Sequence, residues 1–491
     1  MTESGGGTST DTWDVIVIGG GPPGENAAQY SIQGSDRTAV IVERELVGGE
    51  CSYWACMPSK ALLRPIELAE QARLMPGVSA MVTGEIDVSA VLKRRDGFTH
   101  DHDDSSQVQW ANDTNIDVVR GHGRLTGERT VEVTASDGTT QTLTARQAVI
   151  LGTGTTAAVP PIDGLREALP WISRDVTNLH EVPNRVAVIG GGVVASESAT
   201  WLRGLGAQVT VLERGERLLG NVEPSAAQLV MDHFREHGVD VRTGVSVQRV
   251  RRVDAQATGE GHIHGGAVTI TVDDAELTVD EVVVAAGRTP ASTDLGLDTV
   301  GLEPKGFVST DDHLQVQGVD GQWLYAIGDI TGRALLTHMG KYQARICGAV
   351  IAARADGRSI DGAEFLASAD HGQVPQVTFT SPQVASIGLT EEQAHETAEH
   401  RIETVEYGLG NVAGSALQQD GYKGIAKLVI DADDNVIVGA TFAGPDVAEL
   451  LHSATVAVVG RVTLDVLWHA VPSYPTVSEI WLRLLETYRS A

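Results

Sequence analysis

The chain has 491 residues, of which 42% are hydrophobic and 55 are glycine, so its length allows about three α/β domains. Acidic residues outnumber basic ones by 65 to 36, which gives a formal charge of −29. Because DNA, RNA and anionic membranes need a basic surface, this charge argues against all three as partners. The sequence shows no signal peptide and no apolar run of about 20 residues, so we expect a cytoplasmic protein.

A flexible leader rich in glycine, serine and threonine is predicted for residues 1–12. An apolar strand at 14–18 follows it and runs into glycines with the spacing G-x-G-x-x-G, namely Gly19, Gly21 and Gly24. Glycines here allow a tight turn and a close approach to a pyrophosphate at a helix N-terminus. The next apolar strand, at 39–43, ends in Glu43, whose carboxylate can accept hydrogen bonds from a ribose. This segment is predicted to bind a dinucleotide.

Two of the three cysteines, Cys51 and Cys56, follow that acid and lie five positions apart near the start of a predicted helix. A pair at this spacing can close a small disulfide loop, and a helix N-terminus lowers a thiol pKa. Half of a metal site is the competing interpretation, but no second Cys/His pair stands at zinc-ligand spacing. We therefore predict a redox pair and no metal site.

A second dinucleotide segment begins with the apolar strand at 185–189. Small residues again follow at the same spacing, namely Gly190, Gly192 and Ala195. The next strand, at 208–213, ends in Glu213. A carboxylate there accepts from a ribose 2′-OH and repels a 2′-phosphate, so we expect NADH to be preferred, with NADPH possible because Arg214 and Arg217 are near.

Three more apolar strands end where the backbone must pass close to a ligand or a neighbouring strand. They run into Gly154, Gly287 and Asp329. After about residue 365 the pattern changes to alternating stretches typical of an antiparallel sheet. The predicted fold class is α/β, with two doubly wound Rossmann-like nucleotide-binding domains and a C-terminal α+β domain. The predicted boundaries are 13–160 with 286–364, 161–285, and 365–491.

The segment Gly48-Gly-Glu-Cys51-Ser-Tyr-Trp-Ala-Cys56-Met-Pro-Ser-Lys60 resembles the signature of the class I pyridine nucleotide–disulfide oxidoreductases. The likeness extends over nearly the whole chain, with the family motifs in order. It implies an enzyme with a discontinuous FAD domain, an NAD(P) domain and a dimer-interface domain, in a homodimer whose subunits share active sites.

The resemblance also implies a role for each matching residue. Cys56 is the thiolate that contacts the flavin, Cys51 is the interchange thiol, and Lys60 with Glu197 is the ion pair beside the flavin N5. Further matches to the FAD site are Gly19, Gly21, Gly24, Glu43, Gly154 and Asp329. Matches to the nicotinamide-nucleotide site are Gly190, Gly192, Ala195 and Glu213.

The sequence departs from the family on the substrate side. The disulfide-reducing members end in His-Pro-Thr-x-x-Glu, in which the histidine is the acid–base catalyst and the glutamate orients it. This chain has Tyr474-Pro-Thr-Val-Ser-Glu479, so the resemblance places Tyr474 and Glu479 at these catalytic positions. A tyrosine, with an ordinary pKa of about 10, is a poor proton shuttle at neutral pH. His469 is a possible substitute base or an ordinary loop residue. Mercuric reductase has a tyrosine at this place, but also a C-terminal cysteine pair that this chain lacks.

The cysteine loop also differs. Glu50 stands before Cys51, where a carboxylate should slow thiol attack, and Tyr53 and Trp54 are either packing residues or a stacking surface for a quinone. We predict electron transfer from NADH through FAD to the cysteine pair and then to an unidentified small-molecule acceptor. A small disulfide such as lipoamide, a thiophilic metal ion and a quinone remain open, as does a flavin-binding partner protein with little turnover.

Overall fold

A computed structural model describes residues 11–397 and 399–490 of the chain. The chain divides into two compact units. The first consists of Met1–Tyr53, Thr99–Thr156 and Arg288–Asp370, and the second of Trp54–Phe98, Ala157–Gly287 and His371–Ala491. Most of the predicted leader lies outside the described residues, although Thr12 already belongs to the first strand.

The first unit contains a seven-stranded sheet whose parallel part holds the first predicted dinucleotide segment. Its parallel strands are β3 (Ile116–Arg120), β2 (Ala39–Glu43), β1 (Thr12–Ile18), β6 (Thr140–Leu151) and β16 (Leu324–Ala326). The apolar residues of β1 are buried on both faces, as a parallel strand covered by other layers requires. Two antiparallel strands, β4 (His122–Gly127) and β5 (Thr130–Thr134), extend the sheet from β6.

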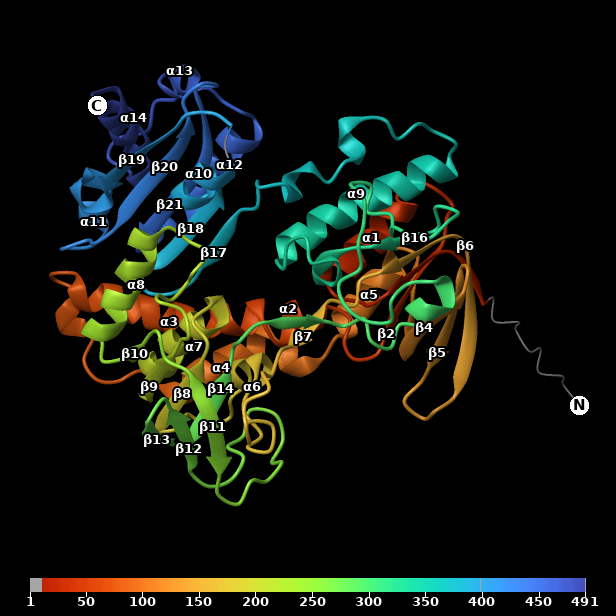
Figure 1. The fold of residues 1–491 in the computed structure, drawn as a ribbon, viewed down its shortest axis with the longest axis horizontal. Helices are drawn as coiled ribbons and strands as arrows, with labels where there is room; N and C mark the ends of the chain where they lie inside the picture. The colour runs from red at the N-terminus through yellow and green to blue at the C-terminus, as the bar shows by residue number, and fades with distance from the viewer. Residues whose placement is uncertain (1–10, 398, 491) are drawn as a thin grey trace, which may run out of the picture. The chain divides into compact units, whose positions relative to one another are not determined.

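Helices α1 (Pro22–Ile32) and α9 (Thr337–Ala355) pack against each other beside this sheet (Figure 1). Gly348 of α9 allows their close approach, because a Cβ there would lie 2.5 Å from Cβ of Tyr30 on α1. Cys347 of α9 is fully buried in the core between them, and burial raises the pKa of its thiol. It is a packing residue.

The second unit holds a parallel sheet with the order β10 (Asp240–Arg242), β9 (Gln208–Leu212), β8 (Arg185–Ile189) and β14 (Glu281–Val284). Helices α7 (Val193–Gly204) and α8 (Pro224–Glu236) connect its strands. A small antiparallel sheet follows, made of β11 (Val247–Arg252), β12 (Val268–Val272) and β13 (Ala275–Val279). Helix α3 (Cys56–Leu74) packs on α7, and the segment Trp54–Phe98 that contains it belongs to this unit.

The C-terminal part of the second unit is a five-stranded antiparallel sheet. Its order is β17 (Gln376–Thr378), β18 (Gln383–Gly388), β21 (Val436–Gly444), β20 (Ile425–Asp431) and β19 (Ile402–Gly408). Helices α12 (Leu451–Val459) and α14 (Ile480–Ser490) cover it. The predicted fold class is confirmed. The units separate at 53/54, 98/99, 156/157, 287/288 and 370/371, and the second unit unites 157–287 and 371–491 with the segment 54–98 that contains α3.

Candidate functional site

The first dinucleotide loop joins β1 to α1 and closes on itself without room for side chains. Gly19 has a φ of +106°, and a Cβ there would lie 2.4 Å from the carbonyl oxygen of Gly152. A Cβ on Gly24 would lie only 2.0 Å from the carbonyl oxygen of Gly19. Gly21 is the N-cap of α1 and offers no capping side chain. The free N–H groups at this helix end are therefore available to an anionic ligand.

Glu43, at the end of β2, lies beside this loop. Its Oε2 accepts the backbone N–H of Gly20 at 2.7 Å, and its Oε1 accepts that of Glu45 at 2.7 Å. Each carboxylate oxygen retains a lone pair after these bonds. The carboxylate is thus fixed next to the glycine loop and still able to accept from a ribose, which fits the FAD-ribose role that the resemblance implies.

Asp329 and Gly154 lie on two turns of the same unit. Thr155, which follows Gly154, connects the turns by a hydrogen bond to Asp329. The hydroxyl of Thr155 donates to Oδ2 of Asp329 at 2.9 Å, and Nε of Arg288 donates to that hydroxyl at 2.9 Å. Gly154 has a φ of +70°, which favours glycine. Burial raises the pKa of Asp329, while Thr155 and Arg288 oppose that rise. The carboxylate of Asp329 is therefore held in place by a chain of hydrogen bonds.

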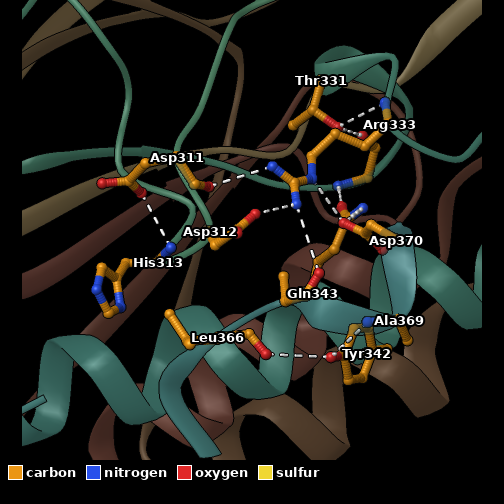
Figure 2. A network of polar contacts seen from close by, with 12 residues as sticks. Asp311, Asp312, His313, Thr331, Arg333, Tyr342, Gln343, Leu366, Ala369 and Asp370 are labelled. Carbon is orange, nitrogen blue, oxygen red and sulfur yellow. Dashed lines mark hydrogen bonds and ion pairs between the residues drawn. The ribbon is translucent and has the colours of Figure 1, made fainter. Parts of the chain in front are cut away.

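A buried network holds the turn that carries Asp329, and sequence reasoning missed it (Figure 2). The backbone N–H of Gly328 donates to Oε1 of Gln343 at 2.7 Å, and Nε2 of Gln343 donates to Oδ2 of Asp370 at 3.0 Å. Nε of Arg333 donates to the same Oδ2 at 2.7 Å. Gln343 lies on α9, so this helix both covers the sheet and positions the Asp329 turn.

The second loop joins β8 to α7, and its first glycine has nearly the same conformation and the same close backbone contact as the first glycine of the other loop. Gly190 has a φ of +118°, and a Cβ there would lie 2.4 Å from the carbonyl oxygen of Ala285. Gly192 is the N-cap of α7, and the helix accommodates the fully buried methyl group of Ala195. Gly287, with a φ of +125°, follows β14. The loop can approach a pyrophosphate as the first one can.

Glu213 lies just past the end of β9, the position of Glu43 in the first unit. Its Oε1 accepts the backbone N–H of Gly215 at 2.5 Å. A Cβ on Gly191 would lie 2.7 Å from its Oε2, so this oxygen faces the second loop. Arg214 is exposed, and Arg217 donates to the carbonyl of Gly220. The carboxylate is placed to accept from a ribose.

Lys60 and Glu197 form an ion pair between α3 and α7. Nζ of Lys60 lies 2.7 Å from Oε2 of Glu197, whose side chain is only 5% exposed. The second oxygen, Oε1, accepts the backbone N–H of Phe379 at 2.9 Å. Lys60 Nζ also lies 4.7 Å from the centroid of the Phe379 ring. Both carboxylate oxygens are satisfied, so burial of this charge is compensated.

The two cysteines lie in consecutive helices on either side of the division between the units. Cys51 lies in α2 (Gly49–Tyr53), and Cys56 is the first residue of α3. Both side chains are half-buried. Cys56 precedes Lys60 by one helical turn, which puts both at the N-terminal end of α3. Glu50 Oε2 lies 4.0 Å from Nη2 of Arg288, a partial counter-charge for this carboxylate.

Tyr53 and Trp54 are packing residues. Tyr53 is fully buried and its hydroxyl donates to the carbonyl of Val47 at 3.1 Å. Trp54 is 7% exposed, and its indole N–H donates to Oε1 of Glu260 at 3.0 Å. The guanidinium of Arg174 lies 4.1 Å from the centroid of the Trp54 ring. One ring face is therefore occupied, which leaves no support for stacking of a quinone on Trp54.

Tyr474 and Glu479, at the positions of the family's His–Glu pair, differ in their exposure to solvent and in their contacts. Tyr474 is 75% exposed, whereas Glu479 is buried and its Oε1 pairs with Arg483 at 2.6 Å. Oε2 of Glu479 has no hydrogen-bond partner among the residues described. His469 is exposed, five residues before Tyr474. The buried carboxylate is turned toward α14 in this subunit.

Comparison with protein families defines the class. Residues 13–355 match the pyridine nucleotide–disulphide oxidoreductase family, and residues 374–484 match the dimerisation domain of the same family. The chain belongs to this family of FAD-containing, NAD(P)H-dependent oxidoreductases. The geometry agrees, because each glycine loop joins a strand to a helix and has a carboxylate, of Glu43 or Glu213, beside it. None of the described helices is long and apolar enough to cross a membrane.

Individual relatives are distant but match at least 95% of this chain. Dihydrolipoyl dehydrogenase 3 of Pseudomonas aeruginosa is 32% identical, with 96% of each chain covered. A mercuric reductase of Staphylococcus aureus is 29% identical over 95% of this chain and 81% of that protein. The Cu(II) complex of the HOCl-induced flavoprotein disulfide reductase RclA from Escherichia coli has a TM-score of 0.81 at 22% identity, covering 97% of this chain and 99% of that one. That structure shares the fold.

Proposed function

We propose that this protein uses NADH to reduce a Cys51–Cys56 disulfide through bound FAD and passes the electrons from the dithiol to a small acceptor. The observation that carries the proposal is the start of α3. Cys56 opens the helix, and Lys60, one turn later, is fixed by the buried carboxylate of Glu197. A purely structural helix would gain little from a lysine that a buried carboxylate holds one turn from a half-buried cysteine.

The chain's own residues would divide the work between binding and redox chemistry. Gly19, Gly21, Gly24, Glu43 and Asp329 would hold FAD. When bound, this cofactor accepts a hydride from the nicotinamide and delivers two electrons to a disulfide. Accepting two electrons breaks the S–S bond and leaves two thiolates.

One thiolate then takes a proton and the other stays charged at the N-terminus of α3. There the helix dipole and Lys60 stabilise negative charge. We assign Cys56 to this charged thiolate and Cys51 to the thiol that meets the acceptor. Glu197 positions Lys60.

The nicotinamide coenzyme would bind at the second loop, with Gly190, Gly192 and Ala195 against its pyrophosphate. Glu213 would accept from the adenosine ribose. A 2′-phosphate brought to the same place would meet a carboxylate, so we assign NADH as the preferred donor. Exposed Arg214 is a nearby cation that could partly offset this repulsion.

A small disulfide is our first candidate acceptor, because a dihydrolipoyl dehydrogenase matches 96% of this chain at 32% identity. A thiophilic metal ion is the second candidate. It is favoured by Tyr474 in place of the acid–base histidine and by a relative named mercuric reductase that matches 95% of this chain. Reduction of a thiolate-bound metal ion needs no proton shuttle of the histidine type, so the tyrosine matters less there.

We further propose a homodimer in the cytoplasm, where thiols stay reduced. The dimerisation domain exposes apolar side chains that include Val466, Val471 and Tyr474, at 60%, 86% and 75%. Burying such residues against a second copy would remove them from water. In this arrangement Tyr474 and Glu479 would belong to the active site of the partner subunit.

An acceptor screen with the purified enzyme tests the proposal. NADH oxidation is measured with lipoamide, low-molecular-weight disulfides, Hg(II), Cu(II) and quinones, for wild type and for Cys51→Ser. We expect one disulfide or metal acceptor to be reduced by wild type and to lose at least 100-fold in kcat/KM in Cys51→Ser. Equal rates in both proteins would refute the role of the pair. No turnover with any acceptor would favour a flavin-binding partner protein.

A further inference from the structure

Two histidines at the end of α8 and a glutamate of α3 lie together at a cavity that the proposed reaction does not use. His233 lies in the last turn of α8, and His237 caps that helix. Their rings stack with centroids 3.9 Å apart. Oε2 of Glu70 lies 3.9 Å from Nε2 of His233. One potential donor atom from each of the three side chains lies within 4.8 Å of the others.

The orientation of His237 is fixed by its own helix. Its Nδ1 lies 2.8 Å from the carbonyl oxygen of His233. Because a carbonyl oxygen can only accept, Nδ1 carries the hydrogen and Nε2 keeps its lone pair. Arg203 of α7 donates from Nε to the carbonyl of His237 at 2.7 Å, which holds the helix end. Metal-binding imidazoles are commonly oriented by such a bond from the other ring nitrogen.

The donor set is two imidazoles and one carboxylate, a combination of ligand types that zinc accepts.

The cavity beside these donors has a volume of about 410 Å³, and all three residues line it. It leaves room for a water molecule as a fourth ligand. Two imidazoles, one carboxylate and one water are the ligands of an open tetrahedral zinc site. With bonds of 2.0–2.1 Å, tetrahedral donor atoms lie roughly 3.3 Å apart. The distances between the three donor atoms would therefore shorten by about 1 Å when the ion binds.

We propose that Glu70, His233 and His237 bind one divalent zinc ion, which joins α3 to α8. From the sequence we predict no metal site, which overlooks that His233 and His237 stand four positions apart. The third donor, Glu70, comes from a distant segment, which no local pattern could reveal. Helix α3 begins at Cys56, so the ion would tie the helix of a redox cysteine to the nicotinamide-binding half of the unit.

Zinc titration of the FAD-loaded enzyme by calorimetry tests this site. The protein is treated with EDTA and used with Cys51 and Cys56 oxidised, so that thiolates do not bind the metal. The variants are Glu70→Gln and His237→Ala; the latter replaces an exposed side chain at a helix end. The matched control is His262→Ala, because His262 stacks on His180 at 4.3 Å but lies outside the three-donor groups found in the described part of the chain.

We expect one zinc ion per chain in wild type and in His262→Ala, and at least tenfold weaker binding in Glu70→Gln and His237→Ala. Zinc-edge X-ray absorption should show nitrogen and oxygen ligands without sulfur. The absence of zinc binding in wild type, unchanged affinity in both site variants, or sulfur in the coordination shell would each overturn the assignment.

Discussion

The two dinucleotide loops are built alike at the first glycine and differently at the third position. Gly19 and Gly190 have nearly the same φ, and a Cβ on either would lie 2.4 Å from a carbonyl oxygen of a neighbouring strand's end. At the third position the first loop needs Gly24, because a Cβ would lie 2.0 Å from the Gly19 carbonyl, whereas the second loop holds the methyl group of Ala195.

We propose that the first loop holds FAD, which stays bound, and that the second holds a nicotinamide coenzyme, which leaves after each turnover. A first loop that is closed more tightly on its own backbone would suit this division. The helices after the loops differ too: Glu197 of α7 reaches an ion pair with Lys60, while the corresponding Asn26 of α1 donates to its own helix at the Pro22 carbonyl.

The substitution Gly24→Ala should have the largest effect. The added methyl group cannot avoid the Gly19 carbonyl without moving the loop, so we expect FAD to be lost and unfolding to be easier by at least about 3 kcal/mol. The flavin-to-protein absorbance ratio and a thermal melt measure this. The matched change Ala195→Gly should cost only about 1 kcal/mol; equal losses in the two variants would remove the distinction between the loops.

Glu197→Gln should slow the reaction of the cysteine pair. The amide can still accept from the Phe379 N–H but no longer holds the charge of Lys60, so we expect the rate of flavin reoxidation by the disulfide to fall by about 10- to 100-fold, a barrier change of ~1.4–2.8 kcal/mol. Stopped-flow absorbance after NADH addition follows this step. Asn26→Ala, at the corresponding place on α1, should change that rate less than threefold.

Glu213→Ala should weaken the preference for NADH. Loss of the carboxylate removes a ribose acceptor and the repulsion of a 2′-phosphate, so the ratio of kcat/KM for NADH over NADPH should fall about tenfold, or ~1.4 kcal/mol. Steady-state assays with both coenzymes give the ratio. If wild type already prefers NADPH, the assignment of this carboxylate is wrong.

Glu25, which follows Gly24, should make the free energy of unfolding decrease as the pH rises. Burial raises its pKa from 4.5 to about 7, with Lys341 opposing the rise. Between pH 4.5 and 7 the unfolded chain has released this proton and the folded chain has not, so the free energy of unfolding decreases as pH rises through that window. Glu25→Gln should flatten the profile by about 1–3 kcal/mol. Parallel profiles for both proteins in urea titrations would contradict this.

The sequence predicted the residues whose role is set locally. Gly19, Gly24 and Gly190 occupy turns that tolerate no side chain, and Glu43 and Glu213 end strands beside those turns, so spacing alone was informative. The partner of Trp54 was not predictable in this way: Glu260 lies 206 residues further along the chain. Such contacts depend on packing between elements that no local pattern encodes.

The network around Asp370 was missed for the same reason. Gln343 lies on α9 and contributes an amide that pattern analysis treats as an ordinary polar residue. Its importance comes from bonding both the Gly328 backbone and Asp370. The zinc donors are similar, since two histidines on one helix become a site only when α3 supplies Glu70.

The most direct test of the central claim is a thiol count during anaerobic titration with NADH. The chain has three cysteines. The account predicts that the oxidised, FAD-loaded enzyme, denatured and alkylated, shows one thiol per chain, and that two equivalents of NADH raise this to three. A long-wavelength absorption band from a thiolate beside the flavin should appear with the first equivalent and be absent in Cys56→Ser. A count that NADH leaves unchanged while the flavin bleaches would contradict the account.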